Sequence, residues 1–177
     1  SIAIFANSPI VENSLSGYLS YRSKIWQNTS RAGLPNFFLE DMDFEKYTDF
    51  VINMPLLFVM KNSKYFDAEG KKFKDFMDGK LSILKNIKPN IEDFRNHLAT
   101  IFTEVRLKQY IEIRSLDTCE WDCHCGGPAF YVGLLYGNLN EAFDIVNKWK
   151  ASDVLNAYMD APKKGLNTIL NNKTLLE

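Results

Sequence analysis

The stretch Leu107-Lys108-Gln109-Tyr110-Ile111-Glu112-Ile113-Arg114-Ser115-Leu116-Asp117 carries the clearest strand pattern in the chain. Apolar and polar side chains alternate along it, which predicts one half-buried strand over residues 107–117. Because residues two apart in a strand point to the same face, Tyr110, Glu112 and Arg114 are expected to project together. The isoleucines between them would anchor the strand to a core.

The sequence on both sides of this strand shows mostly helical periodicity. Helices are predicted over residues 14–26, 44–54, 73–78, 91–102, 128–136, 141–149 and 153–159, with a strand-like run over 1–6 and a hairpin over 56–66. The helix that begins at Pro128 has almost no polar face and is therefore expected to be buried. Helices with separate hairpins and one long strand favour an α+β fold, an antiparallel sheet with packed helices, over a doubly wound parallel sheet.

Length and composition describe a foldable globule. The chain has 177 residues, of which 46% are hydrophobic and 24% charged, and this balance excludes a disordered chain. With 21 Lys and Arg against 22 Asp and Glu, no net field attracts nucleic acid or an anionic membrane, so neither is an expected partner. No linker or composition shift divides the chain, and residues 1–177 are expected to form a single unit.

The first residues and the cysteines lead to expectations about the parent protein and its location. It begins without Met inside an apolar run, which favours a fragment of a longer protein. No run is apolar and long enough to span a bilayer, and no targeting segment is recognisable. Cys119, Cys123 and Cys125 are an odd, clustered set, unlike a disulfide framework, so a reducing cytoplasm is the expected location.

Glu112 and Arg114 are the residues best suited to chemistry. A carboxylate beside a guanidinium supplies a hard oxygen ligand for Mg²⁺ and a planar fork for a phosphoryl oxygen, as a Mg-nucleotide site requires. The alternative is an ion pair on a solvated sheet face, which is the commoner meaning of such a pattern. Similarly, Arg22 and Trp26 share a helical face, where Arg22 would meet either a carboxylate ligand or an internal acidic partner.

Two other motifs carry weaker signals. Cys119, Cys123, His124 and Cys125 include zinc-ligand residue types, but a second ligand pair is missing, so thiols in a loop are expected rather than a zinc site. The Gly126-Gly127-Pro128 run lacks the Lys and Ser/Thr of a phosphate-binding loop and reads as a turn.

The stretch from Thr100 to Arg114, followed by Trp121, Cys125 and residues 128–136, resembles the plant and proteobacterial type of glutamate-cysteine ligase. Upstream, residues 5–9, 17–26 and 44–47 continue the match in register. The resemblance implies a fold related to glutamine synthetase, in which an antiparallel sheet forms a funnel. It also implies that this chain is the C-terminal part of a catalytic domain of about double its length.

The resemblance further implies a reaction and a set of roles. ATP phosphorylates the side-chain carboxylate of glutamate, and the amine of cysteine then displaces phosphate to give γ-glutamylcysteine. In this scheme Glu112 is a Mg²⁺ ligand and Arg114 the catalytic cation on the transferred phosphoryl group. Arg22 holds glutamate, and Tyr110 and Trp121 lie at the substrate pocket. The fragment alone is expected to be inactive, and a ligase-derived domain that binds a ligand or partner without catalysis is the alternative.

Overall fold

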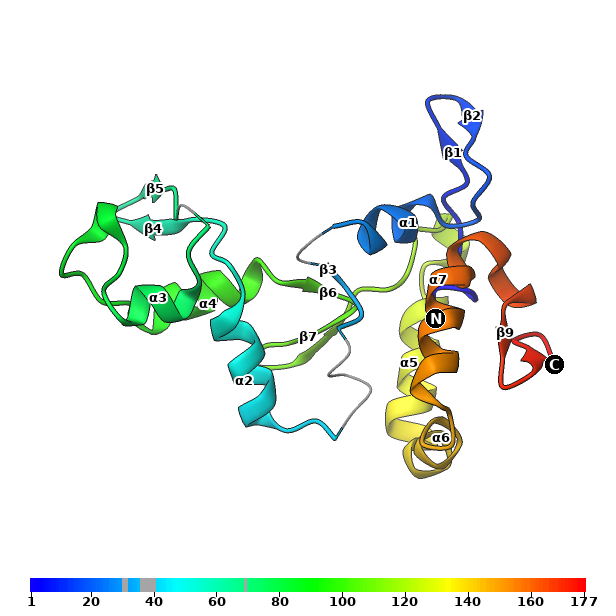
Figure 1. Cartoon of the computed structure of the whole chain (residues 1–177). Coiled ribbons are helices and arrows are strands. Elements are labelled where there is room, and N and C mark those ends of the chain that lie inside the picture. Colours follow the sequence, from blue (N-terminus) through cyan, green and yellow to red (C-terminus); the bar gives the residue numbers. More distant parts are fainter. Residues whose placement is uncertain (30–31, 36–40, 69) are drawn as a thin grey trace. The chain divides into compact units, whose positions relative to one another are not determined.

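The structure of the chain is a computed structural model that describes residues 1–29, 32–35, 41–68 and 70–177. Short elements predominate, and helices alternate with small sheets (Figure 1). The main helices are α1 (Tyr21–Gln27), α2 (Phe44–Asn53), α3 (Phe73–Met77), α4 (Ile91–Ala99), α5 (Gly126–Val132), α6 (Leu139–Val146) and α7 (Ala151–Lys164). A π-helical segment, η4 (Gly133–Gly137), follows α5, and the 3₁₀ turns are η2 (Ser82–Leu84), η3 (Trp121–Cys123) and η5 (Gly165–Asn167).

The strands form two-stranded sheets. Among the described residues there are five of them, β1 (Ile10–Val11) with β2 (Ser14–Leu15), β3 (Ala32–Gly33) with β6 (Phe102–Thr103), β4 (Val59–Lys61) with β5 (Lys64–Phe66), β7 (Val105–Leu107) with β8 (Ile111–Ile113), and β9 (Ile169–Leu170) with β10 (Lys173–Thr174). The β1–β2, β4–β5 and β9–β10 pairs are antiparallel and the β3–β6 pair is parallel. The chain therefore has a mixed α+β architecture with small antiparallel sheets.

The chain divides into two compact units. Unit 1 comprises Ser1–Thr29 and Ile113–Glu177, and unit 2 comprises Ser30–Glu112. A single domain over residues 1–177 stays a prediction. The described part of the chain contains no helix of the length and apolarity needed to cross a bilayer.

Unit 2 follows the sequence pattern closely. The Asp43 side chain accepts a hydrogen bond from the Lys46 amide at 2.7 Å and starts α2, which ends before Pro55 as predicted. Asn62 and Ser63 have φ of 51° and 59°, the left-handed pair that a tight hairpin turn requires, so the predicted hairpin is confirmed. The predicted helix that begins at Phe73 is α3, closed by a glycine at positive φ.

Two apolar clusters fill unit 2. One joins the hairpin to α3 and the following turn and consists of Leu56, Val59, Ala68, Phe73, Phe76, Leu81 and Leu84. The other joins α2 to the end of α4 through Tyr47, Val51 and Ile101. His97 lies between them, stacked on Phe73 at 5.0 Å between ring centroids, and its Nε2 donates to the Val51 carbonyl at 2.8 Å. This histidine is therefore part of the core.

Unit 1 has a smaller core. Its buried apolar cluster among the described residues consists of Ile2, Ala3 and Ala161, with Tyr158 packed against it. The segment before α1 also reaches α7 through the backbone, since the Leu19 and Ser20 amides both donate to the Pro162 carbonyl. The opening residues 1–6 are turns rather than the expected strand, because Ile2 and Ala3 pack against a helix instead of pairing with a neighbouring strand.

Two predicted elements include parts of hairpins. The helix predicted over residues 14–26 begins only at Tyr21, because Glu12 and Asn13 adopt φ of 48° and 62° and close the β1–β2 hairpin. The strand predicted over residues 107–117 is likewise two short strands, β7 and β8, joined through residues 108–110. Tyr110 therefore lies in the connection, outside β8, so the predicted shared strand face does not extend to it.

The helical boundaries also shift. The helix predicted over residues 91–102 ends at Ala99, where the Thr100 hydroxyl donates to the His97 carbonyl at 2.7 Å. The Gly126-Gly127 pair belongs to α5 and is not a turn. The last two helices begin at Leu139 and Ala151, each two residues before the predicted start. Finally, the helix after Pro128 is largely exposed, although burial was expected.

Candidate functional site

Helix α1 positions the first of the predicted site residues, Arg22. The helix begins after Ser20, whose Oγ accepts from the Ser23 amide at 3.2 Å. The Arg22 amide donates to Ser8 Oγ at 3.1 Å, which ties the first turn to the segment before the β1–β2 hairpin. These two hydrogen bonds fix the backbone of the helical turn that carries Arg22.

Two guanidinium groups lie over the same indole ring. The Arg22 guanidinium carbon is 5.3 Å from the centroid of Trp26, and that of Arg114 is 5.7 Å from it. Both distances are within the range of a cation–π contact. The aromatic face attracts each cation, but the two cations repel each other, so a bound anion would relieve the repulsion.

The Arg22 fork is only partly used. Its Nη2 donates to the Arg114 carbonyl oxygen, which links α1 to the segment after β8. Its Nη1 is buried and makes no hydrogen bond within the described part of the chain. A buried guanidinium donor without an acceptor is costly, and carboxylates and phosphates are the ligands that match this fork. The internal acidic partner that the sequence allowed for Arg22 is not found among the described residues.

Asp117 connects the chain segments around this site through hydrogen bonds. Its Oδ2 accepts from the Ser8 hydroxyl at 2.6 Å and from the Asn7 amide at 2.8 Å, and its Oδ1 accepts from the Ser20 hydroxyl at 2.9 Å. Because the hydroxyl of Ser20 has one proton, donation to Asp117 leaves its lone pairs for the α1 cap. The carboxylate thus connects the two segments that carry Arg22 and Arg114. Sequence reasoning missed this role because the three donors lie about 100 residues away in the chain.

Glu112, the predicted magnesium ligand, lies at the end of unit 2 and is paired there with Arg106. Arg106 Nη2 is 2.7 Å and Nε 2.9 Å from Glu112 Oε2, and Nη2 is also 2.9 Å from Oε1. The buried Arg106 guanidinium also donates through Nη1 to the carbonyls of Ala99 and Ile101 at 2.6 and 3.0 Å. Lys108 Nζ lies 3.8 Å from Oε2. The chain passes from unit 2 to unit 1 between Glu112 and Arg114.

This geometry does not fit a magnesium site built from the chain alone. Both Glu112 oxygens face a guanidinium, whereas Mg²⁺ requires oxygen ligands in near-octahedral arrangement. The described residues contain no group of three or more His, Cys, Asp or Glu able to hold a metal ion. Glu112 as a magnesium ligand stays a prediction. The pairing of Arg106 with Glu112 was not predicted, because it depends on β7 and β8 lying side by side.

Tyr47 shows how the Arg106–Glu112 pair is packed. The tyrosine is buried against this pair, and its hydroxyl oxygen accepts from the Leu107 amide at 3.0 Å. Burial raises the pKa of Tyr47 above its ordinary value, an effect that the Leu107 hydrogen bond and the Arg106 charge partly offset. The Leu107 hydrogen bond therefore joins β7, which carries Arg106, to α2.

The two other predicted substrate residues lie on exposed positions. Tyr110 is 58% exposed, and Lys108 Nζ lies 5.8 Å from the centroid of its ring. Trp121 is 86% exposed and stacks on His124 at 5.9 Å between ring centroids. Cys123 and Cys125 are exposed free thiols, and Cys119 is a half-buried one. Exposed aromatic rings are available to a ligand, so both assignments stay predictions.

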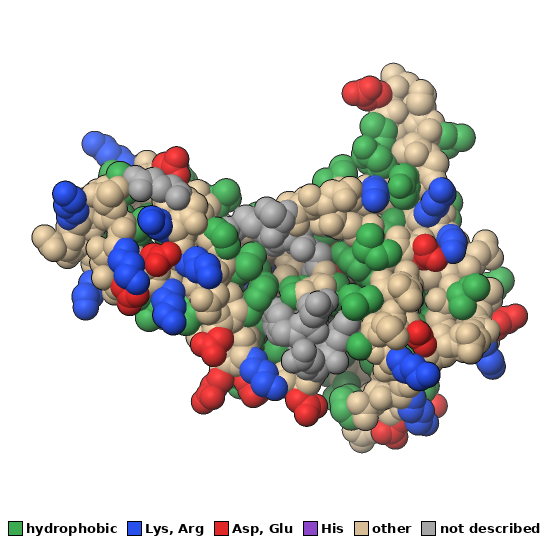
Figure 2. Space-filling view, in the orientation of Figure 1, with side chains coloured by type: hydrophobic (Ala, Val, Ile, Leu, Met, Phe, Trp, Pro, Cys, Tyr) green, Lys and Arg blue, Asp and Glu red, His purple; other side chains and the backbone are tan. Residues whose placement is uncertain are grey.

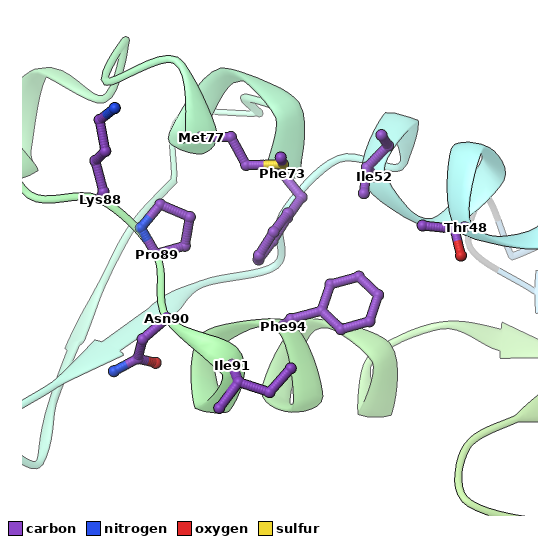
Figure 3. Close-up of a pocket in the computed structure, with 9 residues that line it drawn as sticks. All are labelled: Thr48, Ile52, Phe73, Met77, Lys88, Pro89, Asn90, Ile91 and Phe94. Carbon is purple, nitrogen blue, oxygen red and sulfur yellow. The ribbon is translucent and has the colours of Figure 1, made fainter. Parts of the chain in front are cut away.

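A separate pocket of about 450 Å³ lies within unit 2 between α2, α3 and α4 (Figure 3). Phe73 and Phe94 line it and pack edge to face, with 5.5 Å between ring centroids. Lys88 is the one charged residue in its lining, and its amine points away from the two rings in the close-up. Apart from the Lys88 amine and the Thr48 hydroxyl, the lining carries no acid, base or nucleophile, so this pocket is not the candidate site.

Charged side chains elsewhere are mixed in sign. Over the surface of unit 2, Lys and Arg side chains lie among Asp and Glu side chains (Figure 2). Three of the ion pairs there, Lys80–Asp75, Lys80–Asp78 and Arg95–Glu92, are exposed and close in sequence. Such pairs contribute little to stability. The Arg22–Trp26–Arg114 cluster is therefore the feature of the described chain that most resembles a built anion site.

Comparison with known proteins agrees with the resemblance read from the sequence. The model of "Glutamate-cysteine ligase family 2(GCS2)" matches residues 1–177. Glutamate–cysteine ligase, chloroplastic, from Solanum lycopersicum is 44% identical over 171 residues, which cover 94% of this chain and 33% of the relative. Glutamate–cysteine ligase A, chloroplastic, from Oryza sativa subsp. indica is also 44% identical, over 94% of this chain and 35% of the relative.

These relatives correct one expectation and leave another open. The chain spans about a third of the length of the relatives it matches, not half. Their names place them in chloroplasts, so the cytoplasmic location stays a prediction. The family model covers the whole sequence, including α1, the β7–β8 hairpin and the segment through Trp121. The chain therefore belongs to glutamate-cysteine ligase family 2.

Proposed function

We propose that this chain supplies part of the substrate site of an ATP-dependent glutamate–cysteine ligase. The reaction would join the side-chain carboxylate of glutamate to the amine of cysteine, with γ-glutamylcysteine, ADP and phosphate as products. The observation that carries the proposal is the buried, unpartnered Nη1 of Arg22 beside a second guanidinium on the Trp26 ring. That the bound anions are glutamate and the phosphates of ATP is inferred from family membership, and the role of Mg²⁺ is inferred from the family alone.

Each arginine has a distinct proposed task. Arg22 binds a carboxylate of glutamate through the donor that has no internal acceptor. Arg114 stabilises negative charge on the phosphoryl group as it passes from ATP to the glutamate side chain, the step in which charge is redistributed. Tyr110 and Trp121 form walls of the pocket. The surrounding fold is proposed to be part of a glutamine synthetase-like funnel, consistent with a mixed α+β chain.

The test uses a full-length ligase in which residues 1–177 replace the 171-residue region that they match in the Solanum lycopersicum enzyme, hereafter the Solanum chimera. Formation of γ-glutamylcysteine is followed by mass spectrometry with ATP, glutamate and cysteine. We expect activity in the chimera and a loss of about 100-fold or more in kcat/KM for glutamate in Arg22→Ala, as for removal of a buried charged contact.

Lys24→Ala is the matched control. Lys24 lies on the same helix and also has a cation over an aromatic ring, with Nζ 5.8 Å from the centroid of Tyr18, but it is not part of the Trp26 cluster. We expect Lys24→Ala to stay within about threefold of the parent, because Lys24 lies outside the Trp26 cluster and is only partly buried. Equal losses in the two variants would contradict the proposed role of Arg22. A folded chimera that binds glutamate without forming product would support the non-catalytic alternative.

A further inference from the structure

Seven large apolar side chains on α5, η4 and α6 are exposed, and we refer to six of them, all except Ile145, as the apolar ridge. Their exposed fractions range from 40% at Leu135 to 85% at Tyr136. The other members are Val132, Leu139, Phe143 and Val146, all between 50% and 62% exposed. Isolated exposed apolar residues are normal on a protein surface, but a continuous set marks an interaction site.

On α6 the ridge residues have the spacing of the apolar face of an amphipathic helix. Leu139, Phe143 and Val146 recur at i, i+4 and i+7 on α6. The polar residues of α6, Asn140, Glu141 and Asp144, fall off this stripe. Such a stripe normally faces a core, yet from Gly126 to Lys150 the one buried residue is Gly127. The burial predicted for the helix after Pro128 is therefore not found in the described chain, which leaves these apolar side chains uncovered.

The rest of unit 1 offers little to cover the ridge. Its buried apolar cluster consists of Ile2, Ala3 and Ala161, far fewer large side chains than the ridge exposes. A helical surface with a wide apolar stripe resembles the core of a domain cut open, the kind of surface found in permanent rather than transient contacts. The occupant of the ridge is accordingly expected to be a permanent part of the protein.

We propose that the apolar ridge is the surface on which the remaining polypeptide of a full-length ligase packs. The relatives contain the counterpart of this chain at 44% identity and extend well beyond it, since the match covers only 33% of the Solanum lycopersicum enzyme. Chain joined covalently to these helices meets them at a high effective concentration, which a separate partner lacks. The proposal rests on family membership and is independent of catalysis by Arg22 or Arg114.

Side-chain footprinting with hydroxyl radicals tests the proposal directly. The isolated 177-residue chain and the Solanum chimera are labelled in parallel, and modification of Tyr136, Leu139 and Phe143 is measured by mass spectrometry. We expect high reactivity in the isolated chain and a reduction of about fivefold or more in the chimera, as for side chains in an interface core. The natural Solanum lycopersicum enzyme, labelled over the region matched to residues 132–146, gives the same readout if the chimera fails to fold.

A matched pair of variants tests the energetic role. Phe143→Asp and Asn140→Asp each add one carboxylate to α6, the first on the ridge and the second off it. Both should leave the unfolding temperature of the isolated chain unchanged, since both positions are exposed there. In the chimera, Phe143→Asp should lower the unfolding temperature by several degrees, whereas Asn140→Asp should not.

Three results would overturn the proposal. The first is equal Phe143 reactivity in the isolated chain and the full-length enzymes. The second is protection of Phe143 in a monomeric isolated chain, which would mean that the chain covers its own ridge. The third is a concentration-dependent dimer of the isolated chain that Phe143→Asp abolishes, which would identify a second copy as the occupant.

Discussion

Arg22 and Arg114 carry the same charge over the same indole ring, yet the proposed reaction gives them different tasks. A substrate carboxylate is charged before the reaction begins, whereas charge on the phosphoryl oxygens changes during it. Interactions made equally in the ground and transition states appear in KM, and interactions made chiefly in the transition state appear in kcat. Conservative substitutions that keep the charge and remove the fork should therefore separate the two arginines.

In the Solanum chimera we expect Arg114→Lys to lower kcat by about 10- to 100-fold with little change in the KM for glutamate. Arg22→Lys should act in the opposite way and mainly raise the KM for glutamate. Steady-state kinetics with glutamate varied at saturating ATP and cysteine measures both values. If Arg114→Lys stayed within about threefold of the parent kcat, a change below ~1 kcal/mol in the barrier, Arg114 would have a structural role only.

Asp117 should contribute to the stability of unit 1. It accepts three hydrogen bonds at 2.6 to 2.9 Å from Asn7, Ser8 and Ser20, and hydrogen bonds to a carboxylate are stronger than those to a neutral amide. We expect Asp117→Asn to lower the free energy of unfolding by about 1–3 kcal/mol in urea titrations. Asp122→Asn is the control at an exposed site and should change it by less than about 0.5 kcal/mol. Equal changes would argue against the network.

Tyr47 should make stability fall at alkaline pH. Burial raises the pKa of its hydroxyl in the folded chain, so the folded state holds the proton more tightly than the unfolded state. The corresponding stability is fully present below the unfolded pKa of about 10 and is lost as pH rises through the higher folded pKa. Urea unfolding midpoints between pH 8 and about pH 11 should therefore drop less steeply in Tyr47→Phe than in the parent. Parallel slopes would contradict this assignment.

At the scale of single elements, adjacent glycines at the start of α5 have different surroundings. A Cβ added at Gly127 would lie 2.4 Å from Leu116 Cδ2, whereas one at Gly126 would meet nothing within 4 Å. We expect Gly127→Ala to destabilise the chain by about 1–3 kcal/mol through overpacking. Gly126→Ala should be neutral or stabilising by up to about 1 kcal/mol. Thermal unfolding of both variants measures the difference.

A double-mutant cycle with Leu116→Ala identifies the cause. If contact with Leu116 is responsible, Gly127→Ala should cost less in the Leu116→Ala background, because the clashing methyl group is gone. An unchanged cost in that background would place the effect in the α5 backbone instead.

The elements that the sequence predicted well are those with local determinants. Asp43 caps α2, the Asn62-Ser63 pair turns the β4–β5 hairpin, and Gly79 closes α3, each within a few residues of the element it defines. The errors arose where distant contacts decided the outcome. Ile2 and Ala3 pack against α7 and not into a sheet, and an alternating pattern alone could not show that the chain reverses between β7 and β8.

The candidate site also combines residues that local patterns predicted with contacts that they did not. Residue type and helical spacing were sufficient to select Arg22 with Trp26, the strand alternation selected Arg114, and the family resemblance added their roles. The Arg106 partner of Glu112 and the Asp117 network depend on tertiary contacts that carry no periodic signal. The magnesium role of Glu112 came from the family resemblance and stays a prediction, whereas the guanidinium on both its oxygens is a tertiary contact that the strand pattern did not predict.

At the scale of the whole molecule, the described residues contain only some of the groups that the proposed reaction requires. They place guanidinium groups where an anion can bind, but they contain no group of carboxylates, histidines or cysteines able to hold a metal ion. Phosphoryl transfer from ATP depends on positioning and on charge neutralisation, commonly by metal ions that several carboxylates hold. The matched third of a ligase is therefore expected to need the remaining length of the relatives for catalysis.

We accordingly expect the isolated 177-residue chain to show no glutamate-dependent release of phosphate from ATP, even at millimolar Mg²⁺, while the Solanum chimera forms γ-glutamylcysteine. A coupled phosphate assay and mass spectrometry of the product give the two readouts, and the chimera with Arg22→Ala shows the background. Inactivity has meaning only if the isolated chain is folded, so its cooperative thermal unfolding must be shown on the same sample. Glutamate-dependent turnover by the isolated chain, abolished by Arg22→Ala, would mean that these residues form a complete catalytic site, and the assignment of the missing functions to the rest of the ligase would be wrong.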